Sequence, residues 1–327
     1  MSNFTLNQIQ SLLKNPNSTQ DLCNQARIIR EKYCQNEVFI RGLVEFSNYC
    51  INDCFYCGLR KDNNNLIRYR LSFDEIKAVA QRIIDKGIET IVLQSGDDFF
   101  YKCEDICTLI KEIKKDASHI AITLSLGERS IDEYKAFYDS GADRYLLKHE
   151  TQNEALYKQL HPDQSLKNRI NILRNLRKIG FQIGSGHIVG LPNQTPADLA
   201  EDILFYQDFQ PDMIGIGPFI AQSNTPLSKN PSPNIDLVLR SLALTRIVTK
   251  NAHMPVTTAF FTLGQEDDHI RALTSACNVI MIDFTPKKYA QNYKIYDNKY
   301  RIDFEKMSQI IKKARCVINF KRGDSFK

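Results

Sequence analysis

Short apolar, β-branched runs alternate along this chain with amphipathic stretches of ten to eighteen residues. Apolar runs of this length bounded by turn residues predict buried strands, and apolar positions at a helical period predict helices packed on one face. The runs predict eight strands, over 38–46, 90–94, 120–126, 144–148, 182–189, 213–219, 256–261 and 278–284. The amphipathic stretches predict helices over 72–86, 102–115, 130–140, 164–179, 195–209, 234–251, 265–277 and 303–316.

The ends of several predicted helices carry their own signals. Ser72 is followed three residues later by Glu75, which is the spacing of a capping box. Gly87, Gly141 and Gly180 each stand where a helix should end, just before the next strand. These signals support the strand and helix boundaries that the apolar pattern predicts.

Eight strand–helix units in succession favour a parallel sheet closed into a barrel. We therefore expect an α/β fold, a complete (β/α)8 TIM-type barrel over residues 37–327. Residues 5–34 predict two further helices separated at Pro16, which would form an N-terminal helical cap over residues 1–36. A length of 327 residues would otherwise suggest about two domains, but one barrel accounts for it.

Composition and charge narrow the class of protein. Hydrophobic residues make up 43% and charged residues 25%, as in ordinary globular proteins. No apolar run approaches the ~18 residues of a membrane-spanning helix, and the N-terminus does not resemble a signal or transit peptide. The basic residues behind the net charge of +5 are interleaved with acidic ones, so nothing favours a nucleic-acid partner. We expect a cytoplasmic protein with no membrane association.

Nine cysteines in a chain without a signal peptide favour metal ligation, catalysis or packing over disulfides. Three of them, Cys50, Cys54 and Cys57, follow the first predicted strand with Cys-x3-Cys-x2-Cys spacing. Active sites of such barrels lie at the carboxyl ends of strands, which is where this triplet stands. Three thiolates could hold a 4Fe-4S cluster whose fourth iron stays open. The alternative is a zinc knuckle completed by a distant Cys or His.

With Tyr56 just before its last cysteine, the triplet resembles the Cys-x3-Cys-x-aromatic-Cys signature of the radical SAM superfamily. The resemblance implies that Cys50, Cys54 and Cys57 are the metal ligands and the catalytic centre. It also implies two cofactors, one 4Fe-4S cluster and S-adenosylmethionine (SAM), which would chelate the open iron. One electron from the cluster would then cleave SAM and give a 5′-deoxyadenosyl radical.

The same resemblance assigns SAM-binding roles at other predicted strand ends. Gln94-Ser95-Gly96 is similar to the start of the superfamily's Gly-Gly-Glu motif, whose backbone approaches the methionine amino group. Glu150 would accept hydrogen bonds from the ribose, and Arg169 would hold the methionine carboxylate. The implied cofactor-binding residues are Tyr56, Gln94, Ser95, Gly96, Thr123, Glu150, Arg169 and Val189.

Within the superfamily, the strand-end sequences resemble the HydE-type maturases of FeFe hydrogenase. The matching strings include residues 48–60, 123–129, 141–147 and 212–219. This resemblance implies a small-molecule or organometallic substrate, an external electron donor, and the other maturases HydF and HydG as partners. The implied substrate-binding residues are Lys148, Thr257, Thr258, Met281 and Tyr293.

The chain departs from that family in ways that keep other functions open. Lys148 stands where the family has Arg, and a Lys lacks the planar fork of a guanidinium. One alternative is another radical SAM enzyme like biotin synthase or methylornithine synthase, acting on a small sulfur compound or an amino acid. Another is a non-enzymatic zinc or Fe–S scaffold.

The six other cysteines do not form a second triplet. Cys277 and Cys316 alone lie near the C-terminus, so we expect one cluster. Cys103 and Cys107 are four apart on a predicted helix, which suits half a metal site or an ordinary half-buried face. Cys23, Cys34, Cys277 and Cys316 are expected to be small core residues.

Overall fold

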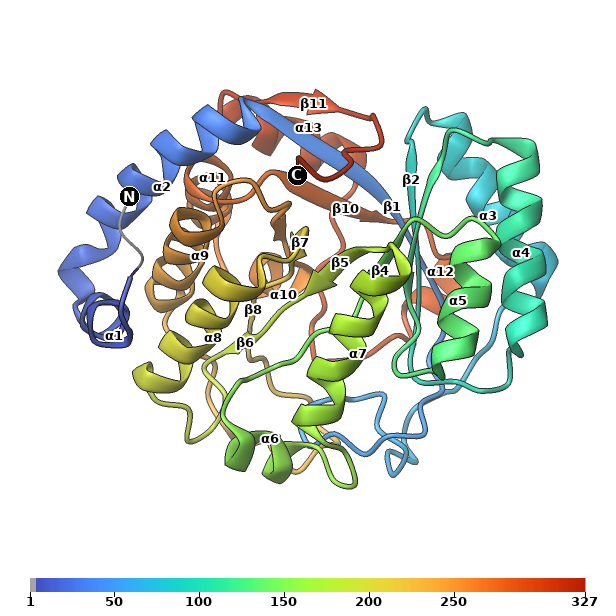
Figure 1. Cartoon of the computed structure of the whole chain (residues 1–327), viewed down its shortest axis with the longest axis horizontal. Coiled ribbons are helices and arrows are strands. Elements are labelled where there is room, and N and C mark those ends of the chain that lie inside the picture. Colours follow the sequence, from blue (N-terminus) through green and yellow to red (C-terminus); the bar gives the residue numbers. More distant parts are fainter. Residues whose placement is uncertain (1–3, 327) are drawn as a thin grey trace.

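The computed structural model describes residues 4–326, and the cap and barrel form the α/β architecture seen in Figure 1. The barrel strands within these residues are β1 (Glu37–Ser47), β2 (Thr90–Ser95), β3 (Ala121–Ser125), β4 (Arg144–Leu146), β5 (Gln182–Ser185), β7 (Met213–Ile214), β9 (Pro255–Val256) and β10 (Val279–Asp283). All are parallel, in the order β7-β5-β4-β3-β2-β1-β10-β9. A parallel bridge between Met213 and His253 joins β7 to the residues leading into β9, so the barrel is nearly closed. The predicted (β/α)8 fold is confirmed.

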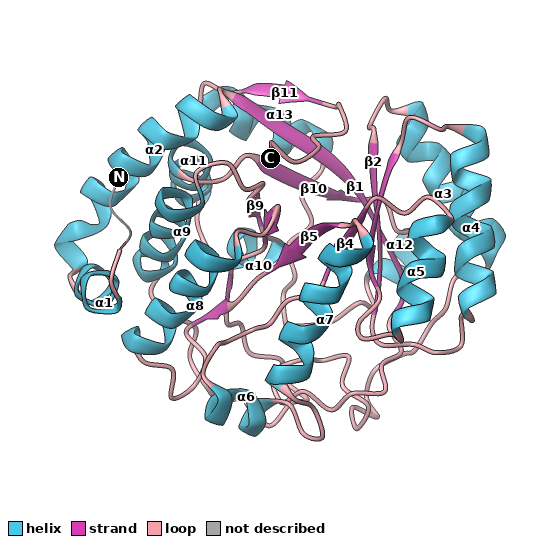
Figure 2. Ribbon diagram, in the orientation of Figure 1, coloured by secondary structure: helices cyan, strands magenta, loops and turns pink. Residues whose placement is uncertain are grey.

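Helices surround this barrel on the outside (Figure 2). They are α3 (Phe73–Asp85), α4 (Cys103–Asp116), α5 (Ile131–Asp139), α7 (Leu166–Ile179), α8 (Pro196–Phe209), α9 (Ile235–Thr249), α11 (Glu266–Ser275) and α13 (Phe304–Lys313). The capping box of Ser72 and Glu75 forms at the start of α3. Gly87, Gly141 and Gly180 have positive φ angles just after α3, α5 and α7. Each of these helices therefore ends where the sequence signals place its end.

The N-terminal helices pack against one side of the barrel's helical layer. They are α1 (Leu6–Lys14) and α2 (Thr19–Cys34), with a short 3-10 turn at Pro16–Ser18 between them. Helix α1 lies against α8, and α2 lies against α9 and α11. The buried Arg240 of α9 donates to the Leu13 carbonyl oxygen and to Thr19 Oγ1, so the cap is tied to the barrel by directed bonds. The boundary near residue 36 stays a prediction.

Three of the predicted strands differ from the structure. The strand expected over 256–261 is wrong, because the chain turns at Thr257 into helix α10 (Thr258–Leu263), whose Phe260 N–H donates to Thr257 Oγ1. The strands expected over 182–189 and 213–219 each break in two. Their second halves, β6 (Ile188–Val189) and β8 (Gly217–Pro218), pair with each other outside the barrel sheet.

The apolar pattern gave no signal for several short elements. These are α6 (Glu154–Leu160), α12 (Lys287–Ala290) and β11 (Val317–Asn319), which pairs with the start of β1. Helix α6 lies beyond the end of β4, and α12 follows β10, so both border the end of the barrel that carries the predicted site. Among the described helices, none combines the length and the apolar character that crossing a membrane requires.

Candidate active site

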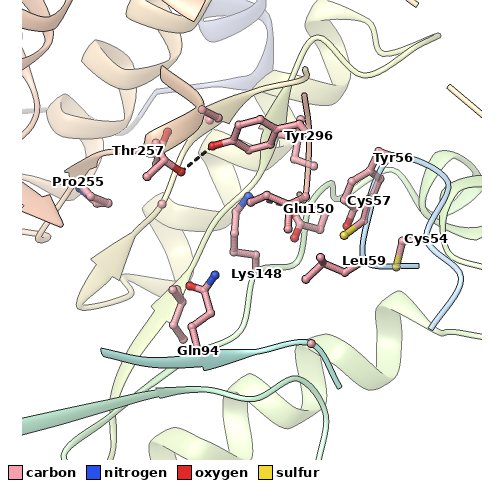
Figure 3. A pocket seen from close by; sticks show the side chains of 18 of the residues that line it. Cys54, Tyr56, Cys57, Leu59, Gln94, Lys148, Glu150, Pro255, Thr257 and Tyr296 are labelled. Atoms are coloured by element: carbon pink, nitrogen blue, oxygen red, sulfur yellow. Dashed lines mark hydrogen bonds and ion pairs between the residues drawn. The ribbon is translucent and has the colours of Figure 1, made fainter. Parts of the chain in front are cut away.

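A cavity of about 360 Å³ opens at the carboxyl ends of the barrel strands and reaches into the barrel (Figure 3). Nearly all the residues predicted from the sequence line it. They are Cys50, Cys54, Tyr56, Cys57, Gln94, Ser95, Gly96, Thr123, Lys148, Glu150, Arg169, Thr257, Thr258, Met281 and Tyr293. Val189 does not line it; that residue is fully buried, and its neighbour Ile188 faces the cavity instead. The barrel thus brings together side chains from seven of its strand ends.

The cysteine loop is held in place by backbone bonds to several parts of the barrel rim. The Ile51 N–H donates to the Asp97 carbonyl oxygen, and the Gly58 N–H donates to that of Ile295. Arg68 connects the two sides of the triplet, because its guanidinium donates to the carbonyl oxygens of Asn48 and Leu59. The positions of the three cysteines are therefore set by groups outside the triplet itself.

The three thiols lie in a buried environment that disfavours their charged form. Burial raises the pKa of Cys50 to about 11 and that of Cys57 to about 12, and it raises the pKa of Cys54 well above its ordinary value. The Cys50 and Cys57 thiolates raise the pKa of Cys54, and the Cys50 thiolate raises that of Cys57, so the three side chains are close to one another. Deprotonating three clustered thiols requires a strongly cationic partner, which a bound iron–sulfur cluster provides.

Residues 4–326 contain no group of three or more His, Cys, Asp or Glu side chains arranged around a single metal ion. His161 Nδ1 lies 3.5 Å from Cys54 Sγ. A 4Fe-4S cubane has four iron corners, so three thiolates leave one corner open for another ligand.

The turn after β2 packs directly on the cysteine loop. A Cβ atom on Gly96 would lie 2.2 Å from the Tyr49 carbonyl oxygen and 2.7 Å from Cys50 Cβ. Only glycine permits this approach. On the neighbouring strand, the Thr123 hydroxyl is buried in the cavity wall without a hydrogen-bond partner among the described residues. An unpaired buried hydroxyl facing a cavity is a group that a polar ligand can satisfy.

Charged groups from the segment after β4 and from α7 form one side of the cavity. Lys148 Nζ lies 2.9 Å from Glu150 Oε2, and Glu150 has a positive φ of 67°. Arg169 Nε donates to Glu128 Oε1 at 2.6 Å, and its Nη atoms donate to the Lys148 carbonyl oxygen and to Gln164. A guanidinium has five N–H donors, so one N–H on each Nη remains for a ligand carboxylate.

The deeper part of the cavity is lined by hydroxyl groups and one buried cation. Tyr296 donates to Thr258 Oγ1 at 2.6 Å, and the Gln94 amide donates to the Tyr293 hydroxyl at 3.1 Å. Arg41, from the middle of β1, is 5% exposed, and its Nε and Nη2 have no partner among the described residues. Arg41 is not among the site residues predicted from the sequence, although an arginine inside an apolar strand indicates a buried polar site.

The remaining cysteines lie outside the cavity. Cys103 and Cys107 share a face of α4, with their sulfur atoms 4.0 Å apart. Cys23, Cys34 and Cys277 are buried, and Cys316 is half-buried. The packing role expected for these four fits that burial.

Comparison with known proteins identifies the family. Residues 44–206 match the Radical SAM superfamily. The [FeFe] hydrogenase maturase subunit HydE of Thermotoga maritima is 46% identical over 278 residues, which cover 85% of this chain and 79% of that protein. The 3-methylornithine synthase of Methanosarcina acetivorans is 27% identical over 269 residues, or 82% of this chain and 75% of that one.

Two solved structures share the fold. Methylornithine synthase (PylB) has a TM-score of 0.81 at 23% identity, over 96% of this chain and 93% of that one. The maturase HydG from Carboxydothermus hydrogenoformans has a TM-score of 0.82 at 18% identity, over 98% and 76%. The family match confirms the two cofactors expected from the sequence, a 4Fe-4S cluster and SAM. This chain belongs to the radical SAM superfamily and, within it, to the HydE family.

Proposed function

We propose that this protein reductively cleaves SAM and acts in the maturation of the FeFe-hydrogenase active-site cluster. One observation carries the proposal: a single cavity joins the cysteine triplet to a deep end lined by hydroxyl groups and basic side chains. The radical would thus form in the same enclosed space that holds the substrate. The relative with 46% identity is a HydE maturase, which supplies the biological context.

In this proposal Cys50, Cys54 and Cys57 hold the cluster. When bound, the cluster supplies the electron that breaks the sulfonium bond of SAM. The two free N–H groups of Arg169 form a fork for the methionine carboxylate. Glu150 accepts from the ribose hydroxyls while Lys148 balances its charge.

Other residues of this wall complete the SAM site. The turn Gln94-Ser95-Gly96 presents backbone groups to the methionine amino group, and the unpaired Thr123 hydroxyl is available to a polar group of SAM. Tyr56 closes the wall beside the triplet. Val189 does not line the cavity, so its contact with SAM stays a prediction.

The substrate is proposed to lie beyond SAM, against Lys148, Thr257, Thr258, Met281 and Tyr293. Hydroxyl and ammonium groups recognise carboxylates and other anionic ligands. Burial raises the pKa of Tyr293 well above its ordinary value, so this residue stays a neutral hydrogen-bond donor. These groups suit a small, anionic, sulfur-containing organometallic complex.

HydF, HydG and an external electron donor are the proposed protein partners. A reducing compartment such as the cytoplasm suits this assignment, since none of the nine cysteines is in a disulfide in the described residues.

Anaerobic reconstitution tests the proposal directly. The wild-type protein should load about four irons per chain, form 5′-deoxyadenosine from SAM with dithionite, and support activation of a purified apo-hydrogenase together with the other maturases. Cys54→Ala should lose both the cluster and SAM cleavage, because the cubane then keeps only two thiolates. Cys103→Ala is the matched control and should retain both.

Two results would overturn the proposal. If Cys54→Ala loads the same cluster and cleaves SAM, the triplet is not the cluster site. If the wild type cleaves SAM but forms 3-methylornithine and gives no hydrogenase activation, the alternative supported by the 27% identical synthase replaces the maturase assignment.

A further inference from the structure

One wall of the active-site cavity is an irregular segment with no helix or strand of its own. It consists of residues 291–301, between α12 and α13, and we call it the wall segment. It presents the side chains of Tyr293, Ile295 and Tyr296 to the cavity. An irregular segment has no ladder of backbone bonds to hold its shape, so the places of these side chains depend on what the segment contacts.

Hydrogen bonds tie the wall segment to the rest of the site. The Gly58 N–H, next to the last cysteine of the triplet, donates to the Ile295 carbonyl oxygen at 2.9 Å. Among the described residues, the Tyr293 hydroxyl has one partner, the Gln94 amide, at 3.1 Å. These bonds hold the backbone of the segment and the tip of the Tyr293 side chain, but a bond at the tip leaves the tilt of the ring open.

A buried ion pair lies against the face of that ring. Lys299, also in the wall segment, is paired with Glu45 near the end of β1, and their side chains are 4% and 1% exposed. Lys299 Nζ lies 4.8 Å from the centre of the Tyr293 ring. The negative face of an aromatic ring attracts a cation, most strongly where water is excluded. The ring of Tyr293 is therefore held at its face as well as at its tip.

Glu45 is itself fixed from several sides. Its N–H donates to Thr285 Oγ1 at 2.8 Å, and its carbonyl oxygen accepts from the Tyr69 hydroxyl at 2.7 Å. Arg301 Nη2 lies 3.8 Å from Glu45 Oε2, and Arg301 Nε lies 2.9 Å from Asp283 Oδ2. With Lys299, the group contains two carboxylates and two cations, so its formal charges balance.

Stability alone does not require a charged pair at this place. Exchanging a buried ion pair for uncharged groups of similar size is often neutral or stabilising, because burial removes both charges from water. What a fixed pair does impose is one geometry. Geometry matters here because Tyr293 is among the proposed substrate contacts, and displacing a contact by about 1 Å can slow a reaction ~100-fold.

We propose that Lys299, held in place by Glu45, is a positioning residue that fixes the Tyr293 ring so that its hydroxyl faces the substrate. Glu45 and Lys299 lie behind the side chains that line the cavity, so they act through Tyr293. The inference rests on the proposed function and adds the group that makes the substrate end of the cavity rigid. A well-held substrate uses each radical that forms, whereas a loosely held one lets radicals be lost.

The test uses two variants that remove the cation in different ways. Lys299→Gln keeps a hydrogen-bond donor to Glu45 and loses only the charge over the ring. The double variant, Glu45→Gln with Lys299→Met, leaves neither charge of the pair, so no partner stays buried and unpaired. Lys114→Met is the matched control, because Lys114 pairs with Asp143 at 2.8 Å and both are half-buried outside the cavity.

Two readouts separate positioning from simple folding. A fluorotyrosine is placed at position 293 of the oxidised, cluster-loaded protein, and fluorine NMR reports the setting and motion of that ring. In unlabelled protein, hydrogenase activation is divided by the 5′-deoxyadenosine formed in the same reaction. A protein that is merely less well folded loses both quantities in proportion, so this ratio does not change with folding alone.

The wild type should give one narrow fluorine signal. In Lys299→Gln and in the double variant the signal should shift and broaden, and the ratio of activation to 5′-deoxyadenosine should fall about tenfold. Lys114→Met should match the wild type in both readouts. Either of the two Lys299 variants is sufficient for the test if the other does not fold.

The outcomes separate this proposal from the proposed function. If the variants keep the wild-type signal and ratio, the ion pair only balances charge and the positioning role is wrong. A changed signal with an unchanged ratio, or an equal fall of the ratio in Lys114→Met, also overturns it. If the wild type cleaves no SAM or activates no hydrogenase, the proposed function fails, and the fluorine signal still shows whether Lys299 holds the ring.

Discussion

Behind the site, two buried histidines that match no metal-binding motif link strand ends to helices by hydrogen bonds. His149 Nδ1 lies 3.0 Å from Ser185 Oγ, and its Nε2 lies 3.1 Å from Asp202 Oδ1. His187 bonds Tyr206 at 2.9 Å and Ser241 at 3.0 Å in the same way. These bonds tie the ends of β4 and β5 to α8 and α9. They hold His149, which directly precedes Glu150, and His187, which pairs with Glu150 in a parallel bridge, and the strained positive φ of Glu150 depends on such support.

The buried His187 predicts a pH dependence of stability. Burial lowers its pKa from 6.5 to about 3, so the folded protein does not take up the proton that the unfolded chain binds below pH 6.5. Stability is therefore full above pH 6.5 and is lost as the pH falls toward 3, by ~1.4 kcal/mol per pH unit for this group. His187→Gln, which can keep both hydrogen bonds, should remove that part of the slope.

The measurement is the free energy of unfolding in denaturant at a series of pH values from 7 down, with both proteins in the same cluster-loading state. His119→Gln is the control, because His119 is exposed, and it should keep the wild-type slope. An unchanged slope in His187→Gln would show that this histidine is not the group responsible.

At the scale of elements, the site depends on how closely the turn after β2 approaches the cysteine loop. Gly96→Ala places a methyl group 2.2 Å from the Tyr49 carbonyl oxygen, so the loop must shift. We expect iron loading to fall below half of the wild-type level and the free energy of unfolding to drop by about 1–3 kcal/mol. Iron and sulfide analysis with denaturant unfolding measure both effects.

Gly215→Ala serves as the control for this prediction. Its added Cβ would have only the Ser185 carbonyl oxygen nearby, at 4.0 Å, which is an ordinary contact. It should load iron like the wild type. Equal loading by Gly96→Ala would mean that the loop has more freedom than its packing indicates.

The elements that the sequence predicted correctly are those whose period is strong and whose ends carry caps, such as α3 with Ser72 and Glu75. The predicted strand over 256–261 failed for a local reason. Its Thr and Phe residues favour strands by propensity, but the Thr257 side chain accepts a bond from Phe260 and starts a helix. The side-chain cap makes this segment helical, and residue propensities do not take such a cap into account.

The residues of the candidate site also divide into those that the sequence predicts and those that it does not. The triplet and most strand-end residues were predictable because a barrel gathers its strand ends around one opening. Arg41 was not predicted because it stands in the middle of β1, below the strand ends where barrel active sites lie. His161 and Tyr296 were missed because they come from the end of α6 and from an irregular segment after α12. Their positions depend on tertiary packing, which no local pattern encodes.

For the whole molecule, the C-terminal segment 320–326 closes the end of the barrel opposite the cysteine loop. Arg144, the fully buried first residue of β4, donates to the carbonyl oxygens of Arg322 and Gly323 and to Asp324 Oδ1. Phe326 stacks on His253, with ring centres 4.7 Å apart. At this end of the barrel, the segment therefore supplies hydrogen-bond acceptors for Arg144 and an aromatic ring that packs on His253.

A chain that ends at residue 319 should therefore be less stable but still able to load its cluster. Its loss leaves Arg144 with three fewer acceptors, and breaking the partners of a buried charge costs about 3 kcal/mol or more. Thermal unfolding should shift to clearly lower temperature, while iron content stays near the wild-type value because the cysteines lie at the far end.

Lys321→Ala is the control: its side chain is 77% exposed and pairs with Glu89, a surface contact worth ~0–1 kcal/mol. If the shortened chain melts with the full-length protein, the bonds to Arg144 add nothing to stability; if it melts lower and also loses iron, the two ends of the barrel are coupled more tightly than their separation implies.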